Sequence, residues 1–140
     1  MADVTGPTEN AQAIAASALR AQQARMRIIA ENIANADSTS KTPGGDPYRR
    51  QTAVFEPTNV APGVKGVAMT KTLPDSTPFR QEYQPGNPAA DAKGYVKMPN
   101  VDLLFEMADM REANSSYEAN LQVVKQSRQM LSATIELMRT

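Results

Sequence analysis

The stretch DLLFEMADMREANSSYEANLQVVKQSRQMLSATIELM, residues 102–138, contains no proline or glycine. Positions separated alternately by four and three residues are apolar except for Asn114 and Arg128, a spacing typical of a coiled-coil helix. The sequence therefore predicts a C-terminal helix over residues 100–140, with Asn100 or Asp102 as its N-cap and Arg139 at its C-terminal dipole. We call the repeating positions the seam: Leu103, Met107, Met110, Asn114, Tyr117, Leu121, Val124, Arg128, Leu131, Ile135 and Met138.

The length of this helix bears on how the seam is covered. At ~1.5 Å per residue the helix would be roughly 55 Å long, about twice the width of a small compact domain. We therefore expect neighbouring subunits to cover part of the seam. Two interpretations of its polar positions stay open: Arg128 extends to solvent and Asn114 is tolerated near the surface, or Asn114 fixes the register of the packing.

A second proline-free region predicts an N-terminal helix over residues 11–36, after a flexible segment 1–10. Its small and apolar residues recur at helical spacing. The fold class is therefore mainly α, with the two helices forming an antiparallel coiled-coil stalk. The N-terminal stripe is Ala15, Leu19, Gln22, Met26, Ile29, Ile33 and Ala36, and its interface residues are Leu19, Met26, Ile29 and Ile33.

The middle of the chain, residues 37–99, has a different composition. Nine of the ten prolines and six of the seven glycines lie there, so a continuous helix is excluded. Turn signals at residues 63, 74–76, 85–88 and 92–94 separate short alternating segments, which predict a small irregular β insert. Partial disorder before assembly is the alternative. The expected strands are Arg49–Phe55, Val67–Leu73, Phe79–Tyr83 and Gly94–Met98, and the junction motif comprises Asn32, Asn35, Pro43 and Gly44.

Composition restricts the possible functions. Fifteen basic residues balance fifteen acidic ones, which argues against a nucleic-acid partner. The chain has no cysteine and no histidine, and no apolar run is long enough for a membrane span. Neither Pro43-Gly44-Gly45 nor Gly63–Gly66 has the Gly-Lys-Ser/Thr ending of a phosphate loop. We therefore expect no catalytic residues, no cofactor, no metal site and no direct membrane insertion.

Several strings resemble a known family. The string AENIANADST, residues 30–39, is similar to a motif shared by axial proteins of the bacterial flagellum. The strings GYVKMPNVD, residues 94–102, and YEAN, residues 117–120, resemble flagellar basal-body rod proteins. The resemblance covers residues 14–140 almost continuously, although Gly45-Asp46-Pro47 separates the Thr-Pro-Gly string from Tyr48, where the family often has Thr-Pro-Gly-Tyr.

The resemblance implies a non-enzymatic subunit of the proximal rod, the drive shaft that transmits torque across the periplasm and walls the protein export channel. It also implies synthesis in the cytoplasm and export without a cleaved signal peptide. The implied partners are copies of the chain and other rod subunits in a helical array, the membrane ring with its adaptor, and the flagellar export apparatus. Arg49, Arg50, Arg80 and Lys97 are candidates for polar contacts between subunits, or form a solvated face.

Two other interpretations remain open. A helical adaptor or export chaperone would use the same seam to hold a client helix and would be a folded dimer in dilute solution. A peptidoglycan-cleaving enzyme would need paired carboxylates, for which Glu56, Glu82 and Asp91 in the insert are the candidates.

Overall fold

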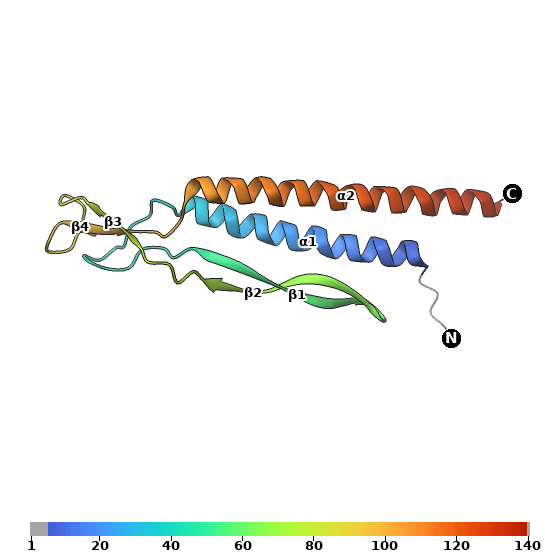
Figure 1. Ribbon diagram of the computed structural model, residues 1–140, viewed down its shortest axis with the longest axis horizontal. Helices are drawn as coiled ribbons and strands as arrows, with labels where there is room; N and C mark the ends of the chain where they lie inside the picture. The colour runs from blue at the N-terminus through green and yellow to red at the C-terminus, as the bar shows by residue number, and fades with distance from the viewer. Residues whose placement is uncertain (1–5, 140) are drawn as a thin grey trace. The chain divides into compact units, whose positions relative to one another are not determined.

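The computed structural model describes residues 6–139, which form two long helices and four strands in the order α1-β1-β2-β3-β4-α2 (Figure 1). The prediction of two long helices with a small β insert between them is confirmed, and the insert is antiparallel, whereas coiled-coil packing of the helices stays a prediction. The chain divides into two compact units: a first unit of residues 6–26, 54–71 and 112–139, and a second unit of residues 27–53 and 72–111. The elements are α1 (Pro7–Ala34), β1 (Gln51–Ala61), β2 (Val64–Pro74), β3 (Arg80–Tyr83), β4 (Tyr95–Met98) and α2 (Leu103–Arg139).

The bounds of α1 differ from the prediction at both ends. The helix begins at Pro7, four residues earlier than predicted, so residues 7–10 are helical, and residues 1–5 of the predicted flexible segment lie outside the described residues. Proline is well tolerated in the first helical turn, because its missing N–H would have no partner in the helix. At the other end, the Ala36 N–H donates to the Ile33 carbonyl (3.2 Å), a tighter turn than an α-helix allows.

The start of α2 is set by Asp102. Its Oδ1 atom accepts the N–H groups of Leu104 (3.0 Å) and Phe105 (3.4 Å), which have no partner within the helix. Asp102 is therefore the N-cap, and Asn100 has another role, described below. Neither helix in the described part of the chain combines the length and apolar character that crossing a membrane requires.

The strands form two separate two-stranded sheets. β1 and β2 are joined through Pro62 and Gly63, and Gly63 has a φ of 73°, which favours glycine in this tight turn. β1 extends six residues past its predicted end and includes Pro57, which a strand can tolerate when one edge is unpaired. β3 and β4 are antiparallel, with Arg80 opposite Met98.

A small apolar cluster supports the β3–β4 pair in the second unit. Val96 and Met98 of β4 are buried together with Ala89, which precedes the strand. The three side chains are short or flexible, so the cluster buries little apolar area for a 140-residue chain. Polar contacts therefore do much to hold the second unit in its folded conformation.

A close approach between the hairpin and α1 defines the first unit. The buried Ser17 hydroxyl donates to the Ile14 carbonyl (2.7 Å) and accepts the Val67 N–H (3.1 Å). Gly66 lies at this contact, and a Cβ atom there would collide with the side chains of Ser17 and Val60. The hairpin can reach Ser17 only because residue 66 lacks a side chain.

Gly66→Ala is expected to lower the free energy of unfolding by about 1–3 kcal/mol, since the added methyl group must displace Ser17 or the hairpin. Urea unfolding monitored by circular dichroism measures this change. Gly86→Ala is the matched control, because a Cβ atom at Gly86 has open space around it. Equal stabilities of the two variants would show that the close approach is unimportant.

Candidate assembly interface and its anchoring network

The seam positions of α2 differ widely in burial. Val124 is buried, whereas Met110, Tyr117 and Leu121 are half-buried. The residues that the chain buries most completely along α2 are instead Glu106, Ala113, Val124 and Ser127. The remaining seam positions are exposed: Leu103, Met107, Asn114, Arg128, Leu131, Ile135 and Met138.

The buried line of α2 is therefore displaced by one position from the seam at two places. Ala113 is buried where the seam has Asn114, and Ser127 is buried where it has Arg128. Ala113 and Ser127 are small residues, which allow close approach, and their two-heptad spacing places them on one face of the helix. The predicted seam consists mainly of large apolar side chains and does not include these two positions. In the described chain, Asn114 and Arg128 are exposed.

The N-terminal stripe is partly buried within the chain. Ile29 is buried, while Leu19, Met26 and Ile33 are half-buried. Four further residues of α1, at positions outside the predicted stripe, are also buried: Ser17, Ala21, Ile28 and Asn32. In the first unit, α1 also contacts α2 through Arg25 and Glu112, whose Nη2 and Oε2 atoms are 3.7 Å apart.

The last three turns of α2 leave large apolar side chains in solvent. Every described residue from 128 to 139 is exposed, including Leu137 at 77% and Met138 at 81%. Clustered exposed apolar residues usually mark an interaction surface, whereas single ones need no explanation. We call this set the terminal apolar surface: Met130, Leu131, Ile135, Leu137 and Met138.

At the junction after α1, the Asn32 side chain pairs with the backbone of β1. Its amide nitrogen donates to the Gln51 carbonyl (2.9 Å), and its Oδ1 accepts the Gln51 N–H (3.0 Å) and the Tyr48 hydroxyl (2.6 Å). Asn32 is 1% exposed, so these bonds satisfy groups that have little access to water. The Asn32 side-chain amide thus makes the two hydrogen bonds with the Gln51 backbone that a neighbouring strand would otherwise make.

The other junction residues make weaker or more local contacts. Asn35 Nδ2 donates to the Glu31 carbonyl (2.8 Å) within the last turn of the helix. Pro43 is exposed, and the Gly44 N–H, at a φ of 71°, donates to the Ala89 carbonyl (3.0 Å). Of the four predicted junction residues, Asn32 is the one that the structure buries in a polar network.

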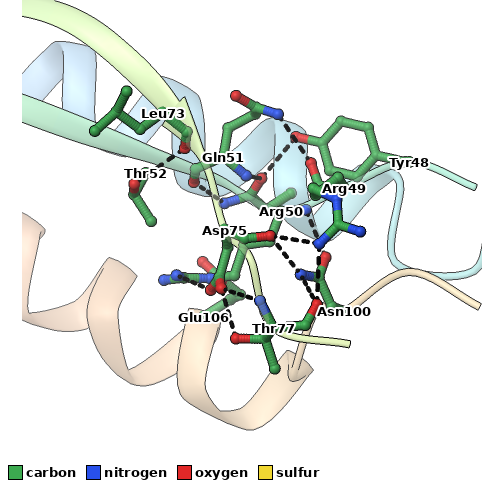
Figure 2. A network of polar contacts seen from close by, with 11 residues as sticks. Tyr48, Arg49, Arg50, Gln51, Thr52, Leu73, Asp75, Thr77, Asn100 and Glu106 are labelled. Atoms are coloured by element: carbon green, nitrogen blue, oxygen red, sulfur yellow. Dashed lines mark hydrogen bonds and ion pairs between the residues drawn. The ribbon is translucent and has the colours of Figure 1, made fainter. Parts of the chain in front are cut away.

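A second polar network is centred on Arg50 (Figure 2). Arg50 Nε donates to Oε1 of Glu106, which is fully buried, and Arg50 Nη1 lies 3.1 Å from Asp75 Oδ2. The Arg50 N–H donates to Asn100 Oδ1 (2.7 Å), and Asn100 Nδ2 donates to the carbonyls of Asp75 and Thr77. The network therefore joins the start of β1, the end of β2 and the first turn of α2 within the second unit.

Arg49, next to Arg50, binds the same segment from another direction. Its Nη1 donates to the carbonyls of Asp75 (2.7 Å) and Thr77 (3.0 Å), and its guanidinium lies 4.1 Å from the centre of the Phe79 ring. Arg50 is half-buried and forms ion pairs with Asp75 and Glu106 inside the second unit, partners that the sequence did not predict. The other two basic residues named in the sequence analysis form ion pairs within the second unit. Arg80 lies 3.9 Å from Glu82, and Lys97 lies 3.1 Å from Asp46.

The surroundings of the network favour the charged forms of Arg50 and Asp75. Two hydrogen bonds from Thr77 are the main cause of the lowered pKa of Asp75; burial opposes them, and a hydrogen bond and the charge of Arg50 lower the pKa further. Burial lowers the pKa of Arg50, but hydrogen bonds and charge from Glu106 and Asp75 outweigh it and leave the pKa raised. Arg50 is therefore a permanent cation facing two carboxylates.

The three carboxylates considered for hydrolysis do not all lie in the same unit. Glu56 is exposed on β1 in the first unit, whereas Glu82 and Asp91 lie in the second unit. Glu82 accepts a hydrogen bond from Gln84 Nε2 (2.8 Å), and Asp91 Oδ1 accepts the N–H groups of Lys93 and Tyr95. Within residues 6–139, no group of acidic side chains is arranged to hold a metal ion.

Comparison with known proteins defines the class of this structure. A family model described as "Flagella basal body rod protein" matches residues 13–40, which include most of α1. A model described as "Flagellar basal body rod FlgEFG protein C-terminal" matches residues 92–137, which include β4 and nearly all of α2. Both long helices therefore lie in regions that match family models of flagellar rod proteins.

Relatives named "Flagellar basal-body rod protein FlgC" match almost the whole chain. The Agrobacterium fabrum protein is 55% identical over 95% of this chain and 96% of its own length. The proteins of Escherichia coli O6:H1 and Bacillus subtilis are 46% and 34% identical, each over 89% of this chain and over 92% and 93% of their own lengths. The chain belongs to the FlgC family of flagellar basal-body rod proteins. It is a structural protein of the flagellum and not an enzyme, so the hydrolase interpretation is set aside.

Proposed function

We propose that the chain is a subunit of the proximal rod that assembles helically through α1 and α2. In this role it forms part of the torque-transmitting drive shaft and of the wall of the export channel. The observation that carries the proposal is the terminal apolar surface, which is exposed in a chain whose relatives are named rod proteins. The seam of α2 and the stripe of α1 form antiparallel coiled-coil contacts, completed by neighbouring subunits.

The magnitude of apolar burial favours an array over an isolated pair. Fully burying one Leu, Ile or Met side chain contributes about 1.5–3 kcal/mol, so the five residues of the terminal apolar surface contribute roughly 7–15 kcal/mol at most. Association itself costs about 4–15 kcal/mol in lost rigid-body freedom. One such contact is therefore marginal. A subunit held on several sides by its neighbours is stable.

The same contacts suit a shaft under torque. Interdigitated side chains resist sliding and twisting, because packed interiors deform little. Contacts between different surfaces of identical or related subunits need not close into a ring, and they then generate helical symmetry. The partners in this proposal are other rod subunits, the membrane ring with its adaptor, and the export apparatus, which the chain passes without a cleaved signal peptide.

Deletion of the gene, followed by complementation, tests the proposal. We expect the deletion to abolish swimming and the complemented strain to carry the chain in purified basal bodies, detected by mass spectrometry and placed by image reconstruction. A motile deletion strain would refute the proposal. Recovery of the chain only from the cytosol, as a stable folded dimer, would instead support an adaptor or export chaperone.

A further inference from the structure

The first turns of α2 expose a second apolar surface, in the second unit. Leu104 is 79% exposed, Phe105 57% and Met107 58%, and Leu103 beside them is 40% exposed. Leu103 also lines an open groove of about 490 Å³, whose walls include Asp37, Pro78 and Val101. This groove shares Asn100 and Asp102 with a smaller cavity of about 260 Å³ that Phe105 lines. We call Leu103, Leu104, Phe105 and the larger cavity the groove of α2.

The groove of α2 has an acidic rim. Asp37 and Asp102 line it and are exposed. The basic residues of the two cavities already have acidic neighbours, since Arg80 lies beside Glu82 and Arg50 pairs with Glu106 and Asp75. The surface therefore combines exposed apolar side chains with negative charge, which fits a partner that is apolar and basic.

The opposite end of α2 has the complementary chemistry. At the start of α2 the exposed charge is that of Asp102, since Glu106 is buried and paired with Arg50. Residues 123–139 expose Lys125 and Arg128, together with Arg139, which lies 3.9 Å from Glu136. These basic side chains are exposed and flank the terminal apolar surface. The family model for this region describes the C-terminal part of FlgEFG rod proteins, so related subunits share the C-terminal segment.

We propose that the groove of α2 is the docking site for the C-terminal helix end of a neighbouring rod subunit, a basic helix with one apolar side. This inference rests on the proposed function and specifies which surfaces meet. The contact joins unlike surfaces, so each subunit leaves one groove and one helix end for the next, and the arrangement continues along the rod. Apolar burial supplies the affinity, and the opposite charges set the direction of stacking.

A photo-crosslinking experiment in living cells tests the contact. Leu104 is replaced by p-benzoylphenylalanine, the cells are irradiated, and cross-linked peptides from purified basal bodies are sequenced by mass spectrometry. We expect the partner peptide to come from the C-terminal helix end of a rod subunit, which in this chain means residues 123–139. Phe105 is the second probe position, because the new ring replaces an existing one if the Leu104 variant fails to assemble.

The controls separate the groove from its surroundings. The same probe at Leu73, which is 45% exposed on β2, is expected to give no cross-link to a C-terminal helix. Asp37→Lys should reduce the Leu104 cross-link about two- to fivefold, as expected for reversing an exposed charge near the contact. Glu56→Lys reverses an exposed charge in the first unit and should leave the yield unchanged.

The outcomes distinguish this inference from the proposed function. A cross-link from Leu104 or Phe105 to any other segment, or no cross-link in motile cells, would overturn the docking site and leave the rod assignment intact. Absence of the chain from the basal bodies of motile cells would overturn the rod assignment itself.

Discussion

Replacing Arg50 with alanine is expected to lower the free energy of unfolding by about 3–5 kcal/mol, the usual cost of leaving a buried charge without its partner. Glu106 is 0% exposed, and its Oε2 atom already has no hydrogen-bond partner among the described residues. Loss of Arg50 would leave the buried carboxylate without its cation. Urea unfolding at neutral pH, monitored by circular dichroism, measures the effect.

Two variants show whether the buried charge is the cause. Arg49→Ala removes an adjacent arginine that binds carbonyl groups and the Phe79 ring, and it leaves no buried charge, so we expect a smaller loss. The double variant Arg50→Met, Glu106→Met removes both charges and should be more stable than Arg50→Ala, because a buried pair can often be replaced by apolar residues at little cost. A double variant less stable than the single one would contradict this explanation.

Leu131→Asp is expected to abolish swimming. In the proposed array this side chain is buried between subunits, and an unpaired carboxylate there costs several kcal/mol at every copy. Leu131 is 36% exposed in the chain itself, so the substitution should leave the fold of the subunit unchanged. Soft-agar motility and mass spectrometry of basal bodies measure the result, and circular dichroism of the purified variant confirms that it folds.

Gln129→Asp is the matched control, since it introduces the same charge two residues away at an exposed polar position of α2. We expect these cells to swim. Wild-type swimming by Leu131→Asp cells would contradict the assignment of the terminal apolar surface to subunit contacts. Loss of motility in both variants would point to a general effect of negative charge on this helix end.

Local signals in the sequence were sufficient for the elements of the fold. The proline and glycine distribution separated the helices from the insert, and the turn at Gly63 was found at the correct position. The main errors were at boundaries, such as the early start at Pro7 and the longer β1. These boundaries depend on whether a proline lies in a first helical turn or on an unpaired strand edge, which composition alone does not distinguish.

The site was less accessible from sequence. The apolar period located the terminal surface of α2, because helical periodicity reports which residues share a face. It did not identify Glu106, Ser17 or Asn32 as buried, since polar residues are normally expected at the surface. No local pattern marks their partners.

By itself, the sequence determined two helices, a turn-rich β insert and the apolar stripes, all of which follow from residues close together in the chain. Only the tertiary structure decided that Asn32 pairs with Gln51 and that Arg50 pairs with Glu106, 56 positions away. It also decided that Ala113 and Ser127 are buried instead of Asn114 and Arg128. The physical reason is that burying a polar group is favourable only when a distant partner satisfies it, and that partner is brought near by folding.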